Sequence, residues 1–381
     1  MKLLFNYQSM AVTVAALLAA MVVTMLAMPA VVRLAVRLGA IDMPGKAGTD
    51  SERHLHTTPT PRMGGLAIFL GFLAAILLMM QLNLRLVTML IGAAILVGLG
   101  MVDDARGLPA SLKLLVQVVA ATIAASGGSL IRYLSAPRFL SSSGHLDLGI
   151  WAMPLTVFWI VLITNAVNLI DGLDGLAAGV SLISSICLVI VALVYSDMTV
   201  AVICGALTGG CAGFLPYNIS PARIFMGDTG STFIGYVLAV ASIQGLFKIY
   251  ALISFAVPFF MLGLPIFDVC FAVVLRLSHG ENPMKADRKH VHYRLLDMGL
   301  TKQQTVAVLY VISGILGVTA VLLSTVKTLR WVPFGVAILV FGFVAYRFYR
   351  HRRAVMRGDA ARKDRPGVDV FSVFPKGGKK S

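Results

Sequence analysis

The stretch "NAVNLIDGLDGLAAG" at residues 165–179 interrupts two apolar runs, "WAMPLTVFWIVLIT" at 151–164 and "LAAGVSLISSICLVIVALVY" at 176–195. Residues three apart drift by about 60° around a helix, and the glycines at 172 and 175 favour a break in a helix. We therefore predict two long helices joined by a polar turn. Four polar side chains lie in or next to this turn: Asn165, Asn168, Asp171 and Asp174.

The composition of the chain indicates that these runs lie in a membrane. Of the 381 residues, 58% are hydrophobic and 13% are charged, and the mean hydropathy is +0.87. Soluble domains carry about 25% charged residues. An all-α, polytopic integral membrane protein with about 11 transmembrane helices is predicted, because a span needs about 20 apolar residues. The expected spans are centred on 12–35, 64–82, 86–102, 111–126, 151–168, 176–195, 199–216, 230–246, 250–275, 304–326 and 331–348.

The distribution of Lys and Arg predicts the orientation of the spans. A net charge of +15 would indicate nucleic acid as the partner of a soluble protein. In a membrane protein it reflects the excess of Lys and Arg in cytoplasmic loops, so no nucleic-acid partner is expected. If the N-terminus is external and the C-terminus is cytoplasmic, all but seven of the 32 Lys and Arg residues lie on the cytoplasmic side of the membrane. The seven are Lys2, Arg85, Arg132, Arg138, Lys248, Lys327 and Arg330.

The C-terminal half has two further features. The expected span at 250–275 contains "FAVPFFMLGLPIFDVC", in which Pro258, Gly263 and Pro265 predict an interrupted helix. This break either frames a groove for a lipid tail or serves packing alone. The transmembrane domain is expected to cover 1–349, and the basic segment 350–381 to be a disordered cytoplasmic tail. The tail either binds anionic lipids or only adds solubility.

Carboxylates gather at span ends on the predicted cytoplasmic side. One aspartate at such a place is most often a helix cap or a hydrated loop residue, but several together repel one another unless a cation is present. Oxygen ligands without cysteine favour Mg²⁺, which takes one or two carboxylates together with substrate phosphates, and Mn²⁺ is an alternative. The aspartates are Asp103, Asp104, Asp171, Asp174 and Asp228.

Basic and imidazole side chains in the same loops predict a phosphorylated substrate. Lys113, Arg62 and Arg288 could neutralise phosphate charge, and His290 and His292 of "HVHY" could converge on a phosphate if they lie in a loop. Zinc is the weaker alternative because no HExxH pattern accompanies these histidines. The cysteines lie in apolar runs, where we expect them to pack as small hydrophobic residues: Cys187, Cys204, Cys211 and Cys270.

Several motifs together resemble the polyprenyl-phosphate N-acetylhexosamine-1-phosphate transferase family, glycosyltransferase family 4. They follow one another along residues 40–300: "IDMP", "RHLHTTPTPRMGG", the pair "DD" followed by Lys113, "NAVNLIDGLDGLAAG", "FMGDTGS", "PIFDV" and "DRKHVHYRLLDMGLT". The resemblance is closest to the branch that transfers N-acetylglucosamine 1-phosphate to undecaprenyl phosphate. One departure lies in the family motif HxHH, which reads His290-Val291-His292-Tyr293 here and leaves the sugar open.

The resemblance implies an Mg²⁺-dependent enzyme of the bacterial inner membrane with its active site on the cytoplasmic face. It would transfer a sugar 1-phosphate from a UDP-N-acetylhexosamine to undecaprenyl phosphate and release UMP, within a homodimer surrounded by membrane lipids. The resemblance assigns catalysis and metal binding to Asp103, Asp104 and Asp228. We expect substrate binding by Lys113, Asn168, Asp171, Asp174, His56, Arg62, Arg288, His290 and His292.

The chemistry of this transfer leaves two routes open. A phosphate monoester has a second pKa of about 6 and is mostly dianionic at pH 7, so charge neutralisation matters more than a general base. Asp228 is the expected metal ligand. Asp103 and Asp104 either share the metal, relay a proton, or form an aspartyl-phosphate in a two-step route.

Other functions fit the sequence less well. The CDP-alcohol phosphotransferase signature needs Arg where this chain has Gly179, and prenyltransferases use aspartates four apart, whereas Asp171 and Asp174 are three apart. A secondary transporter should carry midplane charges and repeated halves, and neither is visible in the sequence. Within the family, the phospho-N-acetylmuramoyl-pentapeptide transferase activity and other UDP-N-acetylhexosamines remain alternatives.

Overall fold

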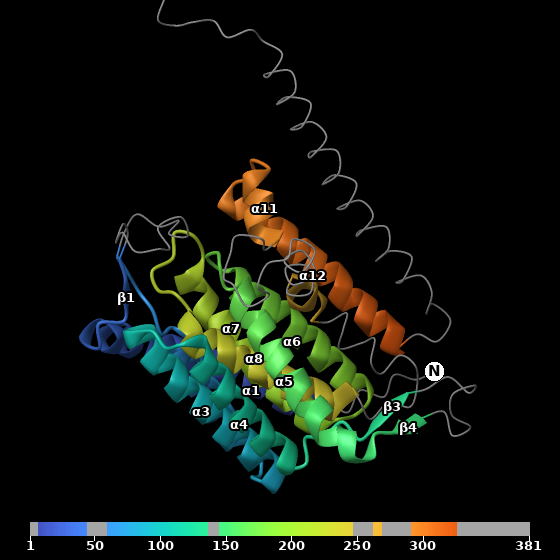
Figure 1. Ribbon diagram of the computed structural model, residues 1–381. Helices are drawn as coiled ribbons and strands as arrows, with labels where there is room; N and C mark the ends of the chain where they lie inside the picture. The colour runs from blue at the N-terminus through green and yellow to red at the C-terminus, as the bar shows by residue number, and fades with distance from the viewer. Residues whose placement is uncertain (1–6, 44–58, 136–144, 247–261, 269–290, 326–381) are drawn as a thin grey trace, which may run out of the picture. The chain divides into compact units, whose positions relative to one another are not determined.

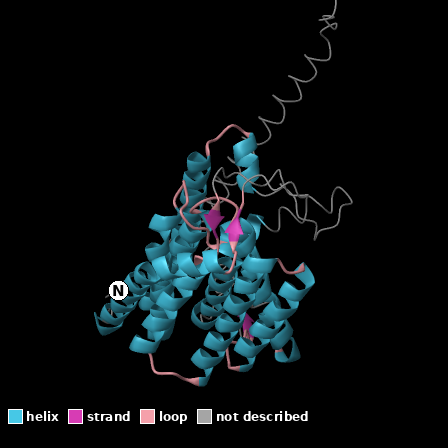
Figure 2. Cartoon of the chain, turned by 90° about the vertical axis from the view of Figure 1, so that its left-hand side faces the viewer, coloured by secondary structure: helices cyan, strands magenta, loops and turns pink. Residues whose placement is uncertain are grey.

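The computed structural model describes residues 7–43, 59–135, 145–246, 262–268 and 291–325, which are almost entirely helical (Figures 1 and 2). Within these residues, six helices are long and apolar enough to cross a membrane, and two shorter apolar helices accompany them. The prediction of an all-α polytopic membrane protein is confirmed. The helices are α1 (Tyr7–Arg37), α2 (Gly65–Met79), α3 (Leu84–Arg106), α4 (Ala110–Ser126), α5 (Ala152–Ile170), α6 (Leu176–Val194), α7 (Met198–Asn218), α8 (Gly227–Leu246), α11 (Val291–Asp297) and α12 (Lys302–Thr325).

The expected spans agree with this helix order wherever the chain is described. Each of the first eight, and the span at 304–326, coincides with a helix, from α1 through α8 and at α12. The interrupted span at 250–275 is described only at 262–268, of which residues 263–268 are helical. The last span, at 331–348, and the tail at 350–381 lie outside the described residues.

Two short antiparallel strand pairs add to the helices. β1 (Ile41–Asp42) pairs with β2 (Thr60–Pro61), and β3 (Tyr133–Ser135) pairs with β4 (His145–Asp147), before the 3₁₀ turn η1 (Gly149–Trp151). The two pairs lie at different ends of the helices (Figure 1). In the first pair Ile41 lies opposite Pro61, and the backbone N–H of Arg62 donates to the carbonyl of Ala40 at 2.9 Å. This pairing holds Arg62 three residues before the start of α2.

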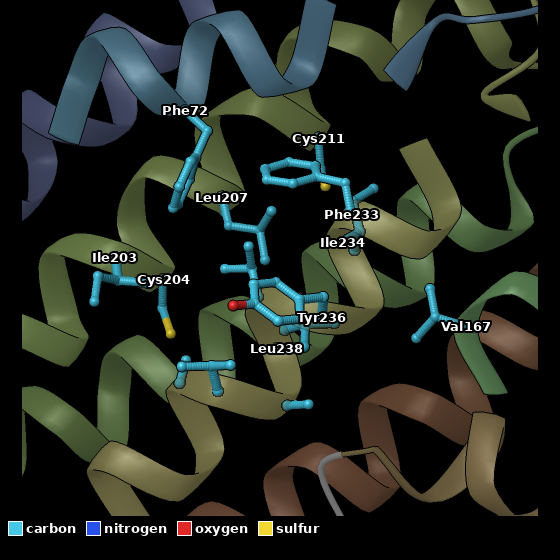
Figure 3. Close-up of a cluster of buried hydrophobic side chains, with 14 of the residues drawn as sticks. Phe72, Val167, Ile203, Cys204, Leu207, Cys211, Phe233, Ile234, Tyr236 and Leu238 are labelled. Atoms are coloured by element: carbon cyan, nitrogen blue, oxygen red, sulfur yellow. The ribbon is translucent and has the colours of Figure 1, made fainter. Parts of the chain in front are cut away.

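Helix α8 lies in the centre of the bundle and contacts α2, α3, α5, α6 and α7. Its side chains are buried along its length, including Phe233 and Tyr236 (Figure 3). Phe233 meets the rings of Phe69 and Phe72 of α2 edge-on, with centroids 5.4 Å apart in both pairs. The first residues of α8 are therefore held by packing on several sides.

Close contact between α1 and α7 depends on three glycines spaced four apart. A Cβ atom at Gly209 would lie 2.0 Å from the carbonyl oxygen of Leu17, and one at Gly213 would lie 2.6 Å from that of Met21. At Gly205 it would lie 2.8 Å from Cγ2 of Thr13. Small residues at such spacing let membrane helices approach each other closely.

Candidate active site

Lys113 joins two of the predicted carboxylates. Its Nζ atom lies 2.9 Å from Oδ2 of Asp103 and 2.9 Å from Oδ2 of Asp228. Asp103 is in the last turn of α3, Lys113 is in the first turn of α4, and Asp228 is in the first turn of α8. Residues 103, 113 and 228 therefore meet at one end of the bundle, as the sequence predicted.

Asp104 is bound to the beginning of α8. Its carboxylate accepts hydrogen bonds from the backbone N–H of Asp228 at 2.9 Å, and from the N–H and the hydroxyl of Thr229 at 3.1 and 2.6 Å. Nε of Arg62 lies 4.0 Å away, and the Asp104 side chain is only 1% exposed. N–H groups in the first turn of a helix have no partner within the helix, and a carboxylate caps them well. Asp104 therefore fixes the position of Asp228.

Glycines allow α8 to begin this close to α2 and α3. A Cβ atom at Gly65 would lie 1.9 Å from Cα of Gly230, and one at Gly100 would lie 2.4 Å from Cα of Thr229. Gly227 has a φ of +71°, and a Cβ atom there would lie 2.3 Å from Oδ2 of Asp104. A side chain at any of these three positions would push Asp228 away from Lys113.

The segment between α5 and α6 is the polar turn predicted from the sequence. Helix α5 ends at Ile170, and α6 begins after Gly175, whose φ is +80°. The backbone N–H of Gly175 donates to Oδ1 of Asn218 at 3.0 Å. Residues 171–175 are called the aspartate turn below. In this form both of its carboxylates lie outside the helices.

The two asparagines of the stretch 165–179 have different surroundings. Asn165 donates to Oε1 of Gln117 at 2.6 Å and so joins α5 to α4. Oδ1 of Asn168, one turn further along, accepts from the hydroxyl of Ser231 on α8 at 2.7 Å. The two asparagines thus help to fix α5 against its neighbours next to the aspartate turn.

A cavity of about 360 Å³ opens among these helix ends. Its wall contains four of the predicted site residues besides Asp228, namely Arg62, Asn168, Asp171 and Asp174. Polar and aromatic residues with no role in the prediction also line it. They are Asp42, Asn218, Phe225 and Tyr293, and all four stand in sequence motifs or loops that also contain the predicted residues.

Asp171 is the cavity carboxyl that most resists ionisation. Burial and, after it, the carboxylate of Asp228 raise its pKa to about 7, with smaller contributions from Asp104 and Asp174; Arg62 opposes them. The repulsion among these groups is what a bound cation would relieve.

The residues of the cavity fit an Mg²⁺ ion that takes part of its ligands from the phosphates of the substrate. Among the described residues, no three His, Cys, Asp or Glu side chains converge to form a complete metal site made of protein alone. Mg²⁺ needs no such cage, because it usually keeps several waters and binds one or two carboxylates with substrate phosphates. Asp171 and Asp228 are carboxylates in the cavity wall that could bind it.

The histidine motif is described only from residue 291 onward. His292 is 1% exposed and is not among the residues that line the cavity, whereas its neighbour Tyr293 lines it. The other predicted binding residues His56, Arg288 and His290 lie outside the described residues. Tyr293 stands where the family motif has a histidine. This difference from the motif was the feature of the sequence that could have marked Tyr293 as a residue of the site.

Comparison with known proteins agrees with these motifs. Residues 86–246 match the family described as glycosyl transferase family 4. The chain is 39% identical over 313 residues to the probable undecaprenyl-phosphate N-acetylglucosaminyl 1-phosphate transferase of Bacillus subtilis (strain 168), covering 82% of this chain and 85% of that protein.

Two other relatives bear the names of related transferases. The decaprenyl-phosphate N-acetylglucosaminephosphotransferase of Mycobacterium tuberculosis (strain CDC 1551 / Oshkosh) is 36% identical, over 78% of this chain and 79% of its own length. The phospho-N-acetylmuramoyl-pentapeptide-transferase of Desulforudis audaxviator (strain MP104C) is 33% identical, over 66% of this chain and 80% of its own length. Since these relatives match over two thirds or more of their own length, and the family match at 86–246 contains the aspartate turn and Asp228, the chain belongs to glycosyl transferase family 4.

Proposed function

We propose that the protein transfers N-acetylglucosamine 1-phosphate from UDP-N-acetylglucosamine to undecaprenyl phosphate and releases UMP. The product would be the first lipid-linked intermediate of a cell-envelope glycopolymer. The observation that carries the proposal is the cavity in which Asp171, Asp174 and Asp228 meet Arg62 at the ends of membrane helices. The names of the relatives from Bacillus subtilis and Mycobacterium tuberculosis support N-acetylglucosamine as the sugar.

The position of the cavity suits two substrates of opposite solubility. A UDP-sugar is soluble in the cytosol, whereas a polyprenyl chain stays in the bilayer, so the two can meet only at a membrane surface. The carboxylates and Lys113 lie at helix ends on the side that the positive-inside rule assigns to the cytoplasm. We therefore place the reaction at the cytoplasmic face of the bacterial inner membrane.

Charge neutralisation is the main task of the site. The attacking lipid phosphate and the pyrophosphate of the donor are both anionic, and catalysis of phosphoryl transfer comes mostly from positioning and electrostatic stabilisation. Arg62 is in the cavity wall, and Lys113 neutralises Asp103 and Asp228 behind it. The lipid phosphate is already mostly dianionic at pH 7, so it needs no strong general base.

Mg²⁺, or Mn²⁺ in its place, would be held by Asp228, and Asp171 is a further carboxylate of the cavity wall that could bind it. When bound, the ion would supply charge stabilisation for the non-bridging phosphate oxygens. Asp104 contributes indirectly, because its oxygens accept hydrogen bonds from α8. The proposal thus moves Asp104 from metal binding to positioning.

Asp103 is better suited to holding Lys113 than to forming an aspartyl-phosphate. Its Oδ1 atom accepts from the backbone N–H of Leu108 at 2.7 Å, and its Oδ2 atom accepts from Lys113. A carboxylate with both oxygens engaged is a poor nucleophile, since attack would first break a hydrogen bond. Direct attack by the lipid phosphate is therefore the route that we propose.

The proposal is tested with purified protein, Mg²⁺, undecaprenyl phosphate and UDP-N-acetylglucosamine labelled in the sugar. Labelled lipid and UMP should form in equal amounts, and UDP-N-acetylmuramoyl-pentapeptide should give neither. Asp228→Asn should reduce turnover by at least about a hundredfold, the size expected for loss of a key electrostatic group. Asp147→Asn, which changes an exposed carboxyl at the last residue of β4, is the matched control and should remain active. Absence of product with every UDP-N-acetylhexosamine would refute the enzyme proposal.

A further inference from the structure

Tyr310 of α12 holds the last residue of the aspartate turn. Its hydroxyl donates to the carbonyl oxygen of Gly175 at 2.6 Å. A Cβ atom at Gly179 would lie 2.1 Å from Cζ of Tyr310, so the ring packs directly on the first turn of α6. Both contacts come from a helix that starts more than a hundred residues after the turn.

His292 of α11 contacts the other end of the same turn. A Cβ atom at Gly172 would lie 2.4 Å from Nε2 of His292 and 3.0 Å from its Cε1. The imidazole is buried at 1% exposure and is absent from the cavity wall, while Gly172 lines the cavity. His292 thus contacts the turn without being part of the cavity wall.

Asp268 fixes the helix that carries His292. Its Oδ1 atom accepts a hydrogen bond of 2.6 Å from the backbone N–H of Val291, the first residue of α11. The Asp268 side chain is 2% exposed. Asp268 is the aspartate of the motif "PIFDV" at 265–269, which no step of the proposed reaction uses.

We propose that Asp268, His292 and Tyr310 are positioning residues, which hold the aspartate turn so that Asp171 and Asp174 face the cavity. The inference rests on the proposed function, in which these two carboxylates serve the reaction. The turn needs support from outside, because it contains two glycines and lies between the end of α5 and the beginning of α6. The two contacts at Gly172 and Gly175 restrain it at both glycines.

The contribution of Tyr310 is tested by Tyr310→Phe, which keeps the ring and removes the donor. The matched control is Tyr236→Phe, because Tyr236 also donates to a backbone carbonyl, that of Met89 at 3.2 Å, far from the turn along α8. Loss of one hydrogen bond should lower kcat about threefold to tenfold in Tyr310→Phe with little change in KM. Tyr236→Phe should change kcat by less than about twofold.

Hydrogen exchange gives a measurement that does not depend on turnover. In detergent without substrates, amides of the peptide covering 171–179 should exchange faster in Tyr310→Phe than in the wild type and in Tyr236→Phe. If the wild type proves inactive while this difference is seen, the proposed function fails and the support of the turn stands. If exchange at 171–179 is unchanged, or both variants behave alike, the positioning proposal is overturned.

The contact between His292 and Gly172 is tested by a double-mutant cycle. Gly172→Ala should lower kcat at least about tenfold in the wild type, because the added methyl collides with the imidazole. In a His292→Ala background, the same change should cost less than about threefold, because the space has been opened. Equal losses in both backgrounds would show that His292 acts elsewhere and would overturn its assignment. Gly98→Ala, at a position with no atom within 4 Å, controls for the added methyl.

Discussion

Thr229 is tied to Asp104 twice, by its backbone N–H at 3.1 Å and by its hydroxyl at 2.6 Å. The pair joins the last turn of α3 to the first turn of α8. With the N–H of Asp228 as a third donor to the same carboxylate, it determines where the neighbouring Asp228 carboxylate lies. A side chain outside the cavity wall therefore controls the geometry inside it.

Thr229→Val should lower kcat about threefold to tenfold, because it removes one hydrogen bond to Asp104 while keeping a similar volume. Thr229→Ser retains the hydroxyl and should stay within about twofold of the wild type. UMP release measures both variants. Thr208→Val, which removes a buried hydroxyl on α7 that is bonded to Ser185, is the control for general loss of packing. Equal losses for Thr229→Ser and Thr229→Val would contradict a role for this bond.

Lys113→Met should reduce kcat/KM by at least about a hundredfold, because it leaves Asp103 and Asp228 without the cation between them. Lys113→Arg keeps the charge but changes the geometry of its donors, and it should restore part of the activity. Lys302→Met removes a lysine at the start of α12 and is the control for net charge. Full activity in Lys113→Met would show that Asp103 and Asp228 keep a working geometry without the lysine, and it would contradict this prediction.

The response to Mg²⁺ should depend on pH through Asp171. Its pKa of about 7 in the folded protein exceeds the ordinary value near 3.8, so the folded state binds the extra proton between these values. Without Mg²⁺, stability should fall as pH rises through this range. Mg²⁺ binds the ionised form, and its stabilising effect should grow over the same interval.

Thermal unfolding in detergent at pH 6 and pH 8, without substrates, measures both effects. The Tm of the metal-free protein should be lower at pH 8, and the increase on adding Mg²⁺ should be larger there. In Asp171→Asn, the difference between the two pH values should shrink in both conditions. An Mg²⁺ effect that is the same at pH 6 and pH 8 would argue against Asp171 as a ligand.

Gly209→Ala should destabilise the protein by about 1–3 kcal/mol, because its methyl group would overlap the carbonyl oxygen of Leu17 and force α1 away from α7. Gly98→Ala adds the same methyl on α3 where no atom lies within 4 Å. Its Tm should equal or exceed that of the wild type, since alanine favours helix. A Tm of Gly209→Ala as high as that of Gly98→Ala would contradict the close packing of α1 and α7.

Hydropathy predicted most of the described fold, because each span must satisfy its own backbone hydrogen bonds in a bilayer and therefore be helical. Its limits appear in the loops. The strand pair of Ile41–Asp42 and Thr60–Pro61 has only two residues on each side, which is too short for a periodic pattern. Pairing of these ends depends on how α1 and α2 pack, which the local sequence does not encode.

The sequence predicted which charged side chains gather at the helix ends, but it did not predict the different contacts that each of them makes. Asp103 and Asp104 are neighbours in the sequence and differ in the structure, since one holds Lys113 and the other caps α8. Successive residues of a helix point about 100° apart, so adjacent carboxylates meet different partners. The same applies to His292 and Tyr293, of which only Tyr293 lines the cavity.

The hydrogen bond from Tyr310 to Gly175 can form only late in the synthesis of the protein by the ribosome. Synthesis proceeds from the N-terminus, and α1 to α8 can leave the ribosome and enter the bilayer before α12 exists. At that stage the nascent chain already carries Asp103, Asp171 and Asp228, and Asn218 of α7 can bind the N–H of Gly175, but the carbonyl of Gly175 does not yet have its hydrogen bond from Tyr310. The aspartate turn acquires this restraint only when α12 inserts, so the nascent protein assembles its cavity late in its own translation.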